Sequence, residues 1–301
     1  MVGAVLVRGA QIVAEAWHEE FGGLHAERNL ITKFVRRIRP DDVLYVNLEP
    51  CSHHGKTPPC TNVIIESGIK RVVFGMYDPH RNVRRSGGQE VLMTAGVEVI
   101  GPVDSVRCRR FNRGFVSLHE RGRPWVTLKR AQTRDGRVAN EDNSPLKITS
   151  RKQDVWAHKY LRVTHDAILV GVETVIRDDP LLTSRTKNKK IDQFSPLRIV
   201  LDPEMRTPLD AQIVTGDMAR GTCLITASGG NSGELQRRGV RVLHVPLHGD
   251  FFVWNDLWSV LTTPSDVFCG ITSILVEGGP TTWRAFREAG VVDEEVVLVG
   301  A

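Results

Sequence analysis

The chain has 301 residues, of which 41% are hydrophobic and 25% are charged, and its formal net charge is +5. This length suits two globular domains, and the composition excludes a disordered or fibrous protein. No run of about eighteen apolar residues and no signal peptide can be recognised, so we expect a cytoplasmic protein without a membrane span.

The cysteine count and the net charge narrow the possible classes of protein and of binding partner. Five cysteines are few for this length and odd in number, which argues against a secreted disulfide framework and favours metal binding or catalysis. The pI near 9.1 is mildly basic. That value is compatible with nucleic acid and equally with an anionic small substrate or cofactor.

The first third of the chain alternates between predicted strands and helices. Strands are expected over residues 4–7, 12–16, 43–49, 71–76 and 97–100. Helices are expected over residues 25–37, 62–67, 89–96 and 106–120. This alternation predicts a sheet with helices packed on its faces.

A polar stretch, Glu-Arg-Gly-Arg-Pro at 120–124, favours a domain boundary. We therefore expect one domain over residues 1–120 and a second over residues 121–301. Strands of the second domain are expected over residues 125–131, 167–171, 197–202, 222–227, 240–245 and 273–279. A helix is expected to begin at Thr281 and Thr282.

Four residues of the first domain have the pattern of a hydrolytic zinc site. His25 and Glu27 lie two residues apart at a predicted helix start, and Cys51 follows a proline after a predicted strand, with Cys60 nine positions later. One imidazole and two thiolates leave a fourth zinc position open for water, whose pKa zinc lowers to about 7. Glu27 would take the proton of that water and pass it to a departing amine. This order of residues is typical of zinc-dependent base deaminases.

The segment between the two cysteines departs from that pattern, because it has eight residues where two are usual. We expect Pro58 and Pro59 to open a helix that carries Cys60, with Thr57 as its N-cap. Two buried thiols without a metal are the structural alternative. We expect His53, His54 and Lys56 to contact an anionic substrate or, as the alternative, to be additional metal ligands.

Stretches along nearly the whole chain resemble the bifunctional deaminase/reductase family of riboflavin biosynthesis. They are His-Ala-Glu at 25–27, the segment 48–60, and the segments 128–139, 172–185, 197–202 and 274–282. The resemblance implies an α/β protein with a cytidine-deaminase-like domain followed by a dihydrofolate-reductase-like domain. It further implies zinc-dependent deamination of 2,5-diamino-6-(5-phosphoribosylamino)pyrimidin-4(3H)-one, then NADPH-dependent reduction of the ribosyl group to a ribityl chain.

The resemblance also implies roles for individual residues. Zinc ligation is implied for His25, Cys51 and Cys60, and proton transfer for Glu27. Substrate contacts are implied for Lys129, Arg162, Leu182, Arg185 and Glu277. Contacts to NADPH are implied for Ala131, Thr174, Asp178, Gly278 and Gly279. Cationic side chains suit this substrate, because a phosphate monoester carries close to two negative charges at pH 7.

The Glu-Gly-Gly-Pro stretch at 277–280 has a physical interpretation of its own. A strand that runs through two glycines into a helix lets backbone N–H groups approach a pyrophosphate. A tight turn that uses glycine for positive φ is the structural alternative. For partners, we expect a homo-oligomer and neither nucleic acid nor a membrane.

Departures from the family pattern leave the second activity open. Pro145 and Lys147 flank Leu146 where the family has Ser-x-Trp, and Pro203 follows Asp202 where the family has serine. A deaminase with a non-catalytic reductase-like domain is therefore one alternative. A nucleic-acid base deaminase is another, although an aromatic content of 6% argues against base stacking. The family's first helix and last strands are also missing, so we expect a fragment or a mis-started reading frame.

Overall fold

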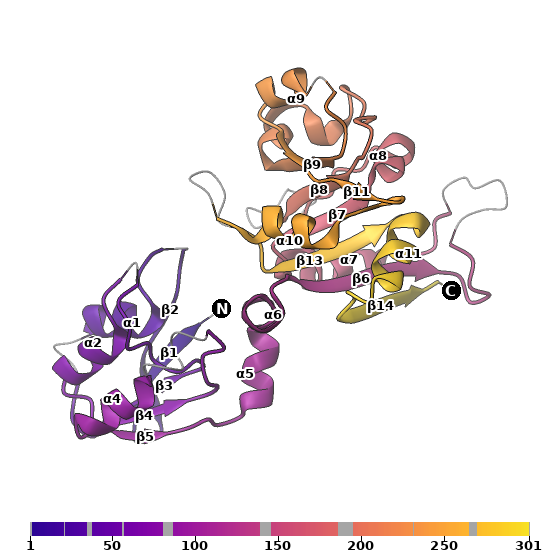
Figure 1. Ribbon diagram of the computed structural model, residues 1–301. Helices are drawn as coiled ribbons and strands as arrows, with labels where there is room; N and C mark the ends of the chain where they lie inside the picture. Colours follow the sequence, from indigo (N-terminus) through magenta and orange to yellow (C-terminus); the bar gives the residue numbers. More distant parts are fainter. Residues whose placement is uncertain are drawn as a thin grey trace. The chain divides into compact units, whose positions relative to one another are not determined.

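The computed structural model describes residues 2–20, 22–34, 38–55, 57–80, 87–138, 146–185, 195–230, 232–264 and 270–300. The chain forms two compact units, residues 1–122 and residues 123–301, each built around its own sheet. Figure 1 shows the first unit in indigo to magenta and the second in magenta to yellow. Both units are α/β, which confirms the predicted fold class.

A five-stranded sheet of order β2-β1-β3-β4-β5 forms the centre of the first unit. Its strands are β1 Gly3–Arg8, β2 Gln11–Trp17, β3 Val43–Val46, β4 Arg71–Phe74 and β5 Glu98–Ile100. Strand β1 is antiparallel to both of its neighbours, whereas β3, β4 and β5 are parallel. All five predicted strands are thereby confirmed.

Three helices cover one face of this sheet. They are α1 Ala26–Phe34, α2 Cys60–Glu66 and α4 Gly88–Thr94. Leu30, Ile64 and Leu92 from these helices are fully buried, and they join Leu44 and Phe74 of the sheet in one hydrophobic core. The core fixes the ends of α1 and α2, which carry the candidate metal ligands.

The single helix predicted over 106–120 is wrong, because two helices form there. They are α5 Ser105–Phe111 and α6 Arg113–Arg121, and they meet at Asn112. The Asn112 side-chain amide donates to the carbonyl oxygen of Cys108 at 3.2 Å. An asparagine side chain that bonds the backbone in this way competes with regular helix geometry, which explains the break.

The second unit has a seven-stranded parallel sheet of order β10-β9-β8-β7-β13-β6-β14. Its strands are β6 Trp125–Gln132, β7 Ala167–Gly171, β8 Leu197–Leu201, β9 Thr222–Thr226, β10 Arg241–His244, β13 Ser273–Gly278 and β14 Glu294–Val299. The first six match predicted strands. Strand β14 was not predicted, because it lies at the sheet edge and begins with two glutamates, which have low strand propensity.

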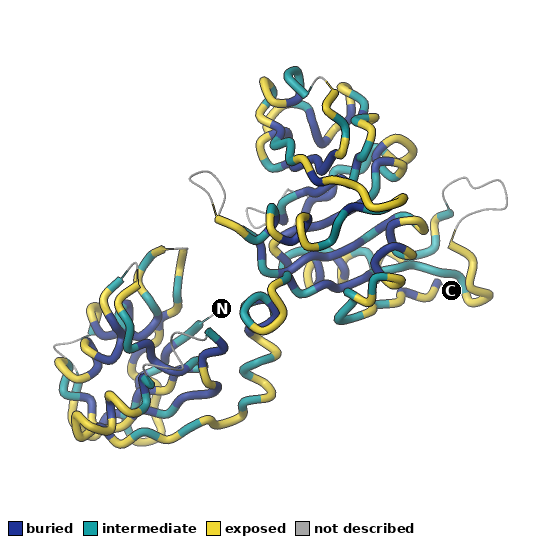
Figure 2. The backbone as a smooth tube through the Cα atoms, viewed as in Figure 1, coloured by how far each residue is buried: buried dark blue, intermediate teal, exposed yellow. Residues whose placement is uncertain are grey.

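Helices pack on both faces of this sheet. The principal ones are α7 Arg151–Tyr160, α8 Val172–Asp178, α9 Gly233–Arg237, α10 Trp254–Thr262 and α11 Pro280–Glu288. Strand β8 shows the two faces directly, since Ile199 joins the core with Phe286 of α11 and Val200 joins the core with Val175 of α8. Figure 2 shows the resulting buried backbone along the central strands. No described helix is long and apolar enough to span a bilayer.

Short elements complete the second unit. They are the 3-10 helices η2 Arg162–Thr164, η3 Gln212–Val214 and η4 Gly216–Gly221, and the hairpin strands β11 Leu247–His248 and β12 Phe251–Phe252. A parallel sheet covered on both faces binds ligands beyond the carboxyl ends of its strands. Functional residues of this unit are therefore expected at the carboxyl ends of its strands.

Candidate metal centre and ligand cleft

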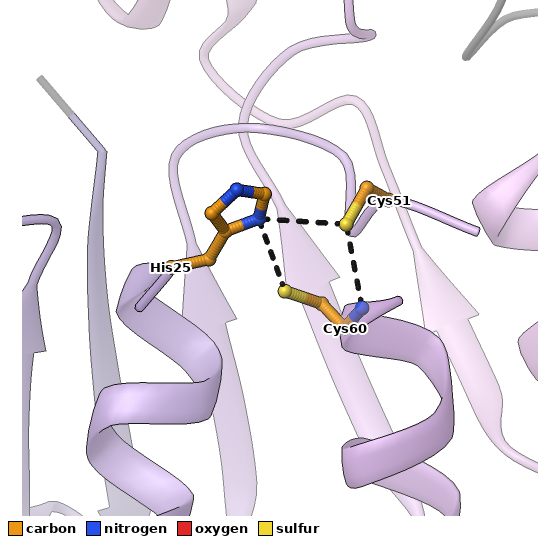
Figure 3. Close-up of side chains that lie close together, drawn as sticks. All are labelled: His25, Cys51 and Cys60. Carbon is orange, nitrogen blue, oxygen red and sulfur yellow. Dashed lines mark hydrogen bonds between the residues drawn. The ribbon is translucent and has the colours of Figure 1, made fainter. Parts of the chain in front are cut away.

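His25, Cys51 and Cys60 bring their ligand atoms together in the first unit (Figure 3). The Nδ1 atom of His25 lies 3.5 Å from the Cys51 sulfur and 3.4 Å from the Cys60 sulfur, and neither cysteine is in a disulfide. A tetrahedral zinc ion with ordinary Zn–N and Zn–S bonds separates nitrogen and sulfur ligands by about 3.6 Å. The three residues therefore fit a zinc ion with little rearrangement.

Local backbone bonds place each of these ligands. The backbone N–H of Asn29 donates to the carbonyl of His25 at 2.8 Å, which closes the first turn of α1 directly after the ligand. The Cys60 N–H donates to the Cys51 sulfur at 3.3 Å, and the Thr61 N–H donates to the Cys51 carbonyl at 3.1 Å. The Cys51 loop is thus attached to the first turn of α2.

The predicted cap of α2 is wrong. The helix begins at Cys60 with Pro59 in the capping position, and the Thr57 hydroxyl is buried without a hydrogen-bond partner among the described residues. The first free N–H of the helix, that of Cys60, bonds to the Cys51 sulfur instead. A sulfur ligand therefore performs the task that an N-cap oxygen performs in other helices.

Glu27 lies in the first turn of α1 and is only 3% exposed. Burial is the main effect that raises the pKa of this carboxyl, and the negative charge of Cys51 contributes as well; the resulting pKa is about 7. The side chain also bonds to Cys60, whereas the described ligand cluster consists of His25 and the two cysteines. A carboxyl with this pKa can both accept and release a proton near neutral pH.

The sulfur ligands are electrostatically prepared for a cation. Hydrogen bonding from Cys60, together with that from His25, lowers the pKa of the Cys51 thiol to about 4 although burial opposes the shift. The same bond to Cys51 raises the pKa of Cys60, and it is joined there by burial. Cys51 therefore favours its thiolate form, whereas Cys60 gives up its thiol proton when a metal ion binds.

His53, in the segment between the cysteines, belongs to a row of three histidine rings. The ring of His53 stacks on that of His80 at 6.3 Å, and His80 meets the edge of His119 at 4.8 Å. The ligand cluster of the described residues contains neither His53 nor the exposed His54, so the extra-ligand alternative gains no support. Lys56 lies outside the described residues.

In the second unit, two predicted substrate residues form a buried ion pair. Arg162 donates from Nε and Nη2 to the two carboxylate oxygens of Glu277 at 2.9 and 2.8 Å, and from Nη1 to the Thr183 carbonyl at 2.8 Å. The Lys129 ammonium lies 3.9 Å from the same carboxylate. Burial alone would raise the pKa of Glu277, but the charges of Arg162 and Lys129 outweigh it and lower this pKa to about 2.

A cleft of about 240 Å³ lies at the carboxyl ends of β7 and β8, against the first turn of α11. Of the predicted NADPH contacts, Thr174 and Gly279 line it, whereas Ala131, Asp178 and Gly278 do not. A Cβ atom added at Gly279 would meet the Thr174 hydroxyl at 3.6 Å, an ordinary contact. Neither glycine has a positive φ, so the tight-turn alternative for 277–280 is wrong.

Four further residues named from the sequence can be placed in the fold. Leu182 is buried with φ of 49°, and Arg185 follows three residues later, next to α7. Lys147 forms an exposed ion pair with Asp154 at 2.6 Å. Pro203 lines the cleft. Pro145 lies outside the described residues.

Sequence reasoning missed several residues of these sites. His158 of α7 accepts a hydrogen bond from the Arg185 backbone, and Arg206 and Phe251 line the cleft. A lone histidine in an unassigned helix carries no sequence signal, and Phe251 comes from a hairpin far along the chain. An arginine a few residues after a strand end could have been suspected from the position of ligands in parallel sheets.

Both units of the chain are similar to known proteins. Residues 1–76 match the model of the cytidine and deoxycytidylate deaminase zinc-binding region, and residues 124–301 match that of the RibD C-terminal domain. The riboflavin biosynthesis protein RibD of Aquifex aeolicus is 39% identical over 99% of this chain and 80% of its own length. The RibD protein of Escherichia coli is 33% identical over 99% of this chain and 80% of its own length.

Solved structures lead to the same family. Acinetobacter baumannii RibD, form 2, has a TM-score of 0.83 and 30% identity, and the match covers 99% of this chain and 79% of that one. A Thermotoga maritima diaminohydroxyphosphoribosylaminopyrimidine deaminase/5-amino-6-(5-phosphoribosylamino)uracil reductase has a TM-score of 0.76 and 33% identity, covering 96% and 77%. The chain belongs to the RibD family of riboflavin biosynthesis proteins.

Proposed function

We propose that this chain catalyses two steps of riboflavin biosynthesis, a zinc-dependent deamination and an NADPH-dependent reduction. The observation that carries the proposal is the His25, Cys51 and Cys60 cluster with the Glu27 carboxyl beside it and outside the ligand set. Family membership supplies the pathway and the second activity. The substrate of the first step is a phosphorylated aminopyrimidine, the type of molecule named for the Thermotoga maritima relative.

In the first step, the protein's part is to hold the reacting groups and to move protons. His25, Cys51 and Cys60 would hold a zinc ion, which would supply a water that ionises near neutral pH. Glu27 is held by α1 next to Cys60, and its raised pKa lets it take a proton from that water. The same carboxyl then passes the proton to the departing amine, so that one residue acts first as base and then as acid.

In the second step, the side chains orient a charged substrate beside the cofactor. NADPH supplies the hydride, and Thr174 and Gly279 are proposed to contact it from the walls of the cleft. Lys129 and Arg185 are proposed to bind the substrate phosphate. Arg162 and Glu277 are proposed to contact the same substrate, and their paired bonds hold the two side chains in place. Catalysis there depends mainly on positioning.

The assignment of each activity to part of the chain is also proposed. Residues 1–120 would carry the deaminase and residues 121–301 the reductase, as the family models suggest for these regions. NADPH contacts from Ala131, Asp178 and Gly278 and a substrate contact from Leu182 remain predictions. A cytoplasmic location and a homo-oligomer remain predictions as well.

One preparation of the whole chain tests the proposal. Glu27→Gln is expected to retain one zinc ion per chain and to lower ammonia release by at least about 10²-fold, since the variant cannot transfer protons. Glu66→Gln, the same change at an exposed position of α2, is the matched control and should leave the rate unchanged. Retained ammonia release by Glu27→Gln would refute the role of Glu27. NADPH oxidation with the deaminated product separates a working reductase from a non-catalytic domain.

A further inference from the structure

His158 lies in the last turn of α7 and is held through both its ring and its backbone. Its Nδ1 atom accepts a hydrogen bond from the Arg185 backbone N–H at 3.3 Å, and its carbonyl accepts one from the Ser184 hydroxyl at 3.2 Å. The segment that provides these donors is itself fixed, because Thr183 and Ser184 are fully buried and Arg162 bonds to the Thr183 carbonyl. The imidazole therefore has a fixed orientation.

The bond from Arg185 also determines where the ring carries its hydrogen. A backbone N–H can only donate, so Nδ1 must keep its lone pair and the single ring hydrogen must lie on Nε2. Protonation of Nδ1 would set two donors against each other. The geometry thus selects a neutral imidazole that presents an N–H group from Nε2.

The charged surroundings favour the same neutral form. The charged groups that act on the ring are Arg162 of η2, Arg185 of the buried segment, Glu277 of β13 and Asp154 one turn earlier on α7. Burial lowers the pKa of His158 first and the two arginines lower it further, whereas the two acids oppose the shift. The ring is therefore uncharged at neutral pH and acts there as a hydrogen-bond donor.

This donor has no partner among the described residues, and Arg185 contributes a positive charge near it. Arg162 and Glu277 neutralise each other through their paired bonds, which leaves Lys129 and Arg185 as the cations of the cluster. A phosphate monoester carries about two negative charges at pH 7, which matches those two cations. An uncharged donor adds a directed hydrogen bond without adding a third charge.

We propose that His158 is an additional substrate-binding residue of the reductase unit, which donates from Nε2 to a phosphate oxygen of the sugar phosphate bound beside Arg185. This inference rests on the function proposed above and adds a contact to it. Lys129 and Arg185 provide the charge that attracts the phosphate, and His158 orients it. Held in this way, the phosphate fixes the position of the sugar relative to the cleft.

Binding of ribose 5-phosphate to the full chain, measured by calorimetry, tests the proposal without turnover. His158→Phe keeps the ring shape but removes both nitrogens, and it is expected to weaken binding about tenfold, the effect of losing one hydrogen bond to a charged group. His158→Gln keeps a terminal N–H donor and should lose less. Lys159→Ala, at the exposed neighbouring position, is the control and should bind normally. In the reductase assay, His158→Phe should raise KM and leave kcat nearly unchanged.

Nitrogen NMR of the unmodified protein tests the same proposal independently of any variant's folding. The His158 ring should show hydrogen on Nε2 and a lone pair on Nδ1, and the Nε2–H signal should shift when ribose 5-phosphate or inorganic phosphate is added but not with ribose. Hydrogen on Nδ1, an equal shift with ribose, or undiminished phosphate binding by a folded His158→Phe would overturn the proposal. A wild-type chain that binds phosphate but oxidises no NADPH would contradict the proposed reductase activity alone.

Discussion

Replacing Glu277 by glutamine keeps the shape of the side chain but removes the negative charge from a buried ion pair. The side chains of Glu277 and Arg162 are only 9% and 14% exposed, and they are joined by two bonds at 2.9 and 2.8 Å. Glu277→Gln leaves the Arg162 guanidinium buried without its ion-pair partner and with Lys129 nearby. We expect the variant to be markedly less stable, because an uncompensated buried charge is more costly than an absent pair.

The magnitude follows from the pKa of Glu277. Its pKa of about 2 in the folded unit compares with about 4.3 in an unfolded chain, so the ionised carboxylate contributes about 3 kcal/mol to folding at neutral pH. Because the folded pKa is the lower one, this stabilisation is complete above about pH 4.5 and is lost as the pH falls toward about 2. Removal of one partner of a buried pair gives a similar estimate, about 3 to 5 kcal/mol.

Urea unfolding followed by tryptophan fluorescence measures this effect in the second unit. Five of the six tryptophans lie there, and Trp17→Phe removes the sixth, so the fluorescence of that background reports the second unit alone. Glu173→Gln is the matched control. It makes the same change in an ion pair of 2.6 Å with Arg206, but both side chains are about half exposed, so a loss below about 1 kcal/mol is expected.

Two results would refute this reasoning. One is a loss of stability for Glu277→Gln at pH 7 that does not exceed the loss for Glu173→Gln. The other is an unchanged acid dependence, since the variant has no carboxylate at this position and should lose about 3 kcal/mol less than the parent between pH 5 and pH 2. Either result would mean that Arg162 finds other compensation when Glu277 is neutral.

Two further predictions concern the first unit. A Cβ atom at Gly88 would lie 1.8 Å from the Pro50 carbonyl oxygen, next to the ligand Cys51. Gly88→Ala should therefore destabilise the unit by at least about 2 kcal/mol and release zinc in a chelator titration. Gly3→Ala, where the nearest contact would be at 3.8 Å, should do neither. Equal zinc retention by both variants would contradict this. Removal of zinc should lower the melting temperature of the first unit, which circular dichroism of the unmodified chain measures. In the Trp17→Phe background, the urea transition of the second unit should stay unchanged. A fall in both transitions would show that the two units do not unfold independently.

Local residue patterns predicted most strands of this chain but missed one edge strand and one helix break. The five strands of the first unit and six strands of the second were predicted correctly, because each is a short apolar run between turn residues. Strand β14 escaped this approach, since its two glutamates weaken the pattern and only pairing with β6 makes it a strand. The break at Asn112 escaped as well, because a side-chain bond to the Cys108 carbonyl causes it.

The roles of some predicted residues changed for similar reasons. Thr57 was expected to cap α2, but the Cys51 sulfur receives the first N–H of that helix. A substrate contact by Arg162 stays a prediction, and the structure adds that Glu277, 115 positions away, pairs with its charge. The Arg162–Glu277 bond joins residues that become neighbours only after the strands have assembled.

The amino-acid sequence by itself determined the α/β class and the set of candidate zinc ligands, because alternating apolar runs and a His, Cys and Cys pattern are local properties of a chain. The tertiary structure alone decided which charges remain available to a substrate. Strand β13 inserts between β6 and β7, and this order brings Glu277 to Arg162 and Lys129. The backbone of Arg185 similarly orients His158. Such pairings depend on strand order and on how the helices cover the sheet, which no local pattern of residues specifies.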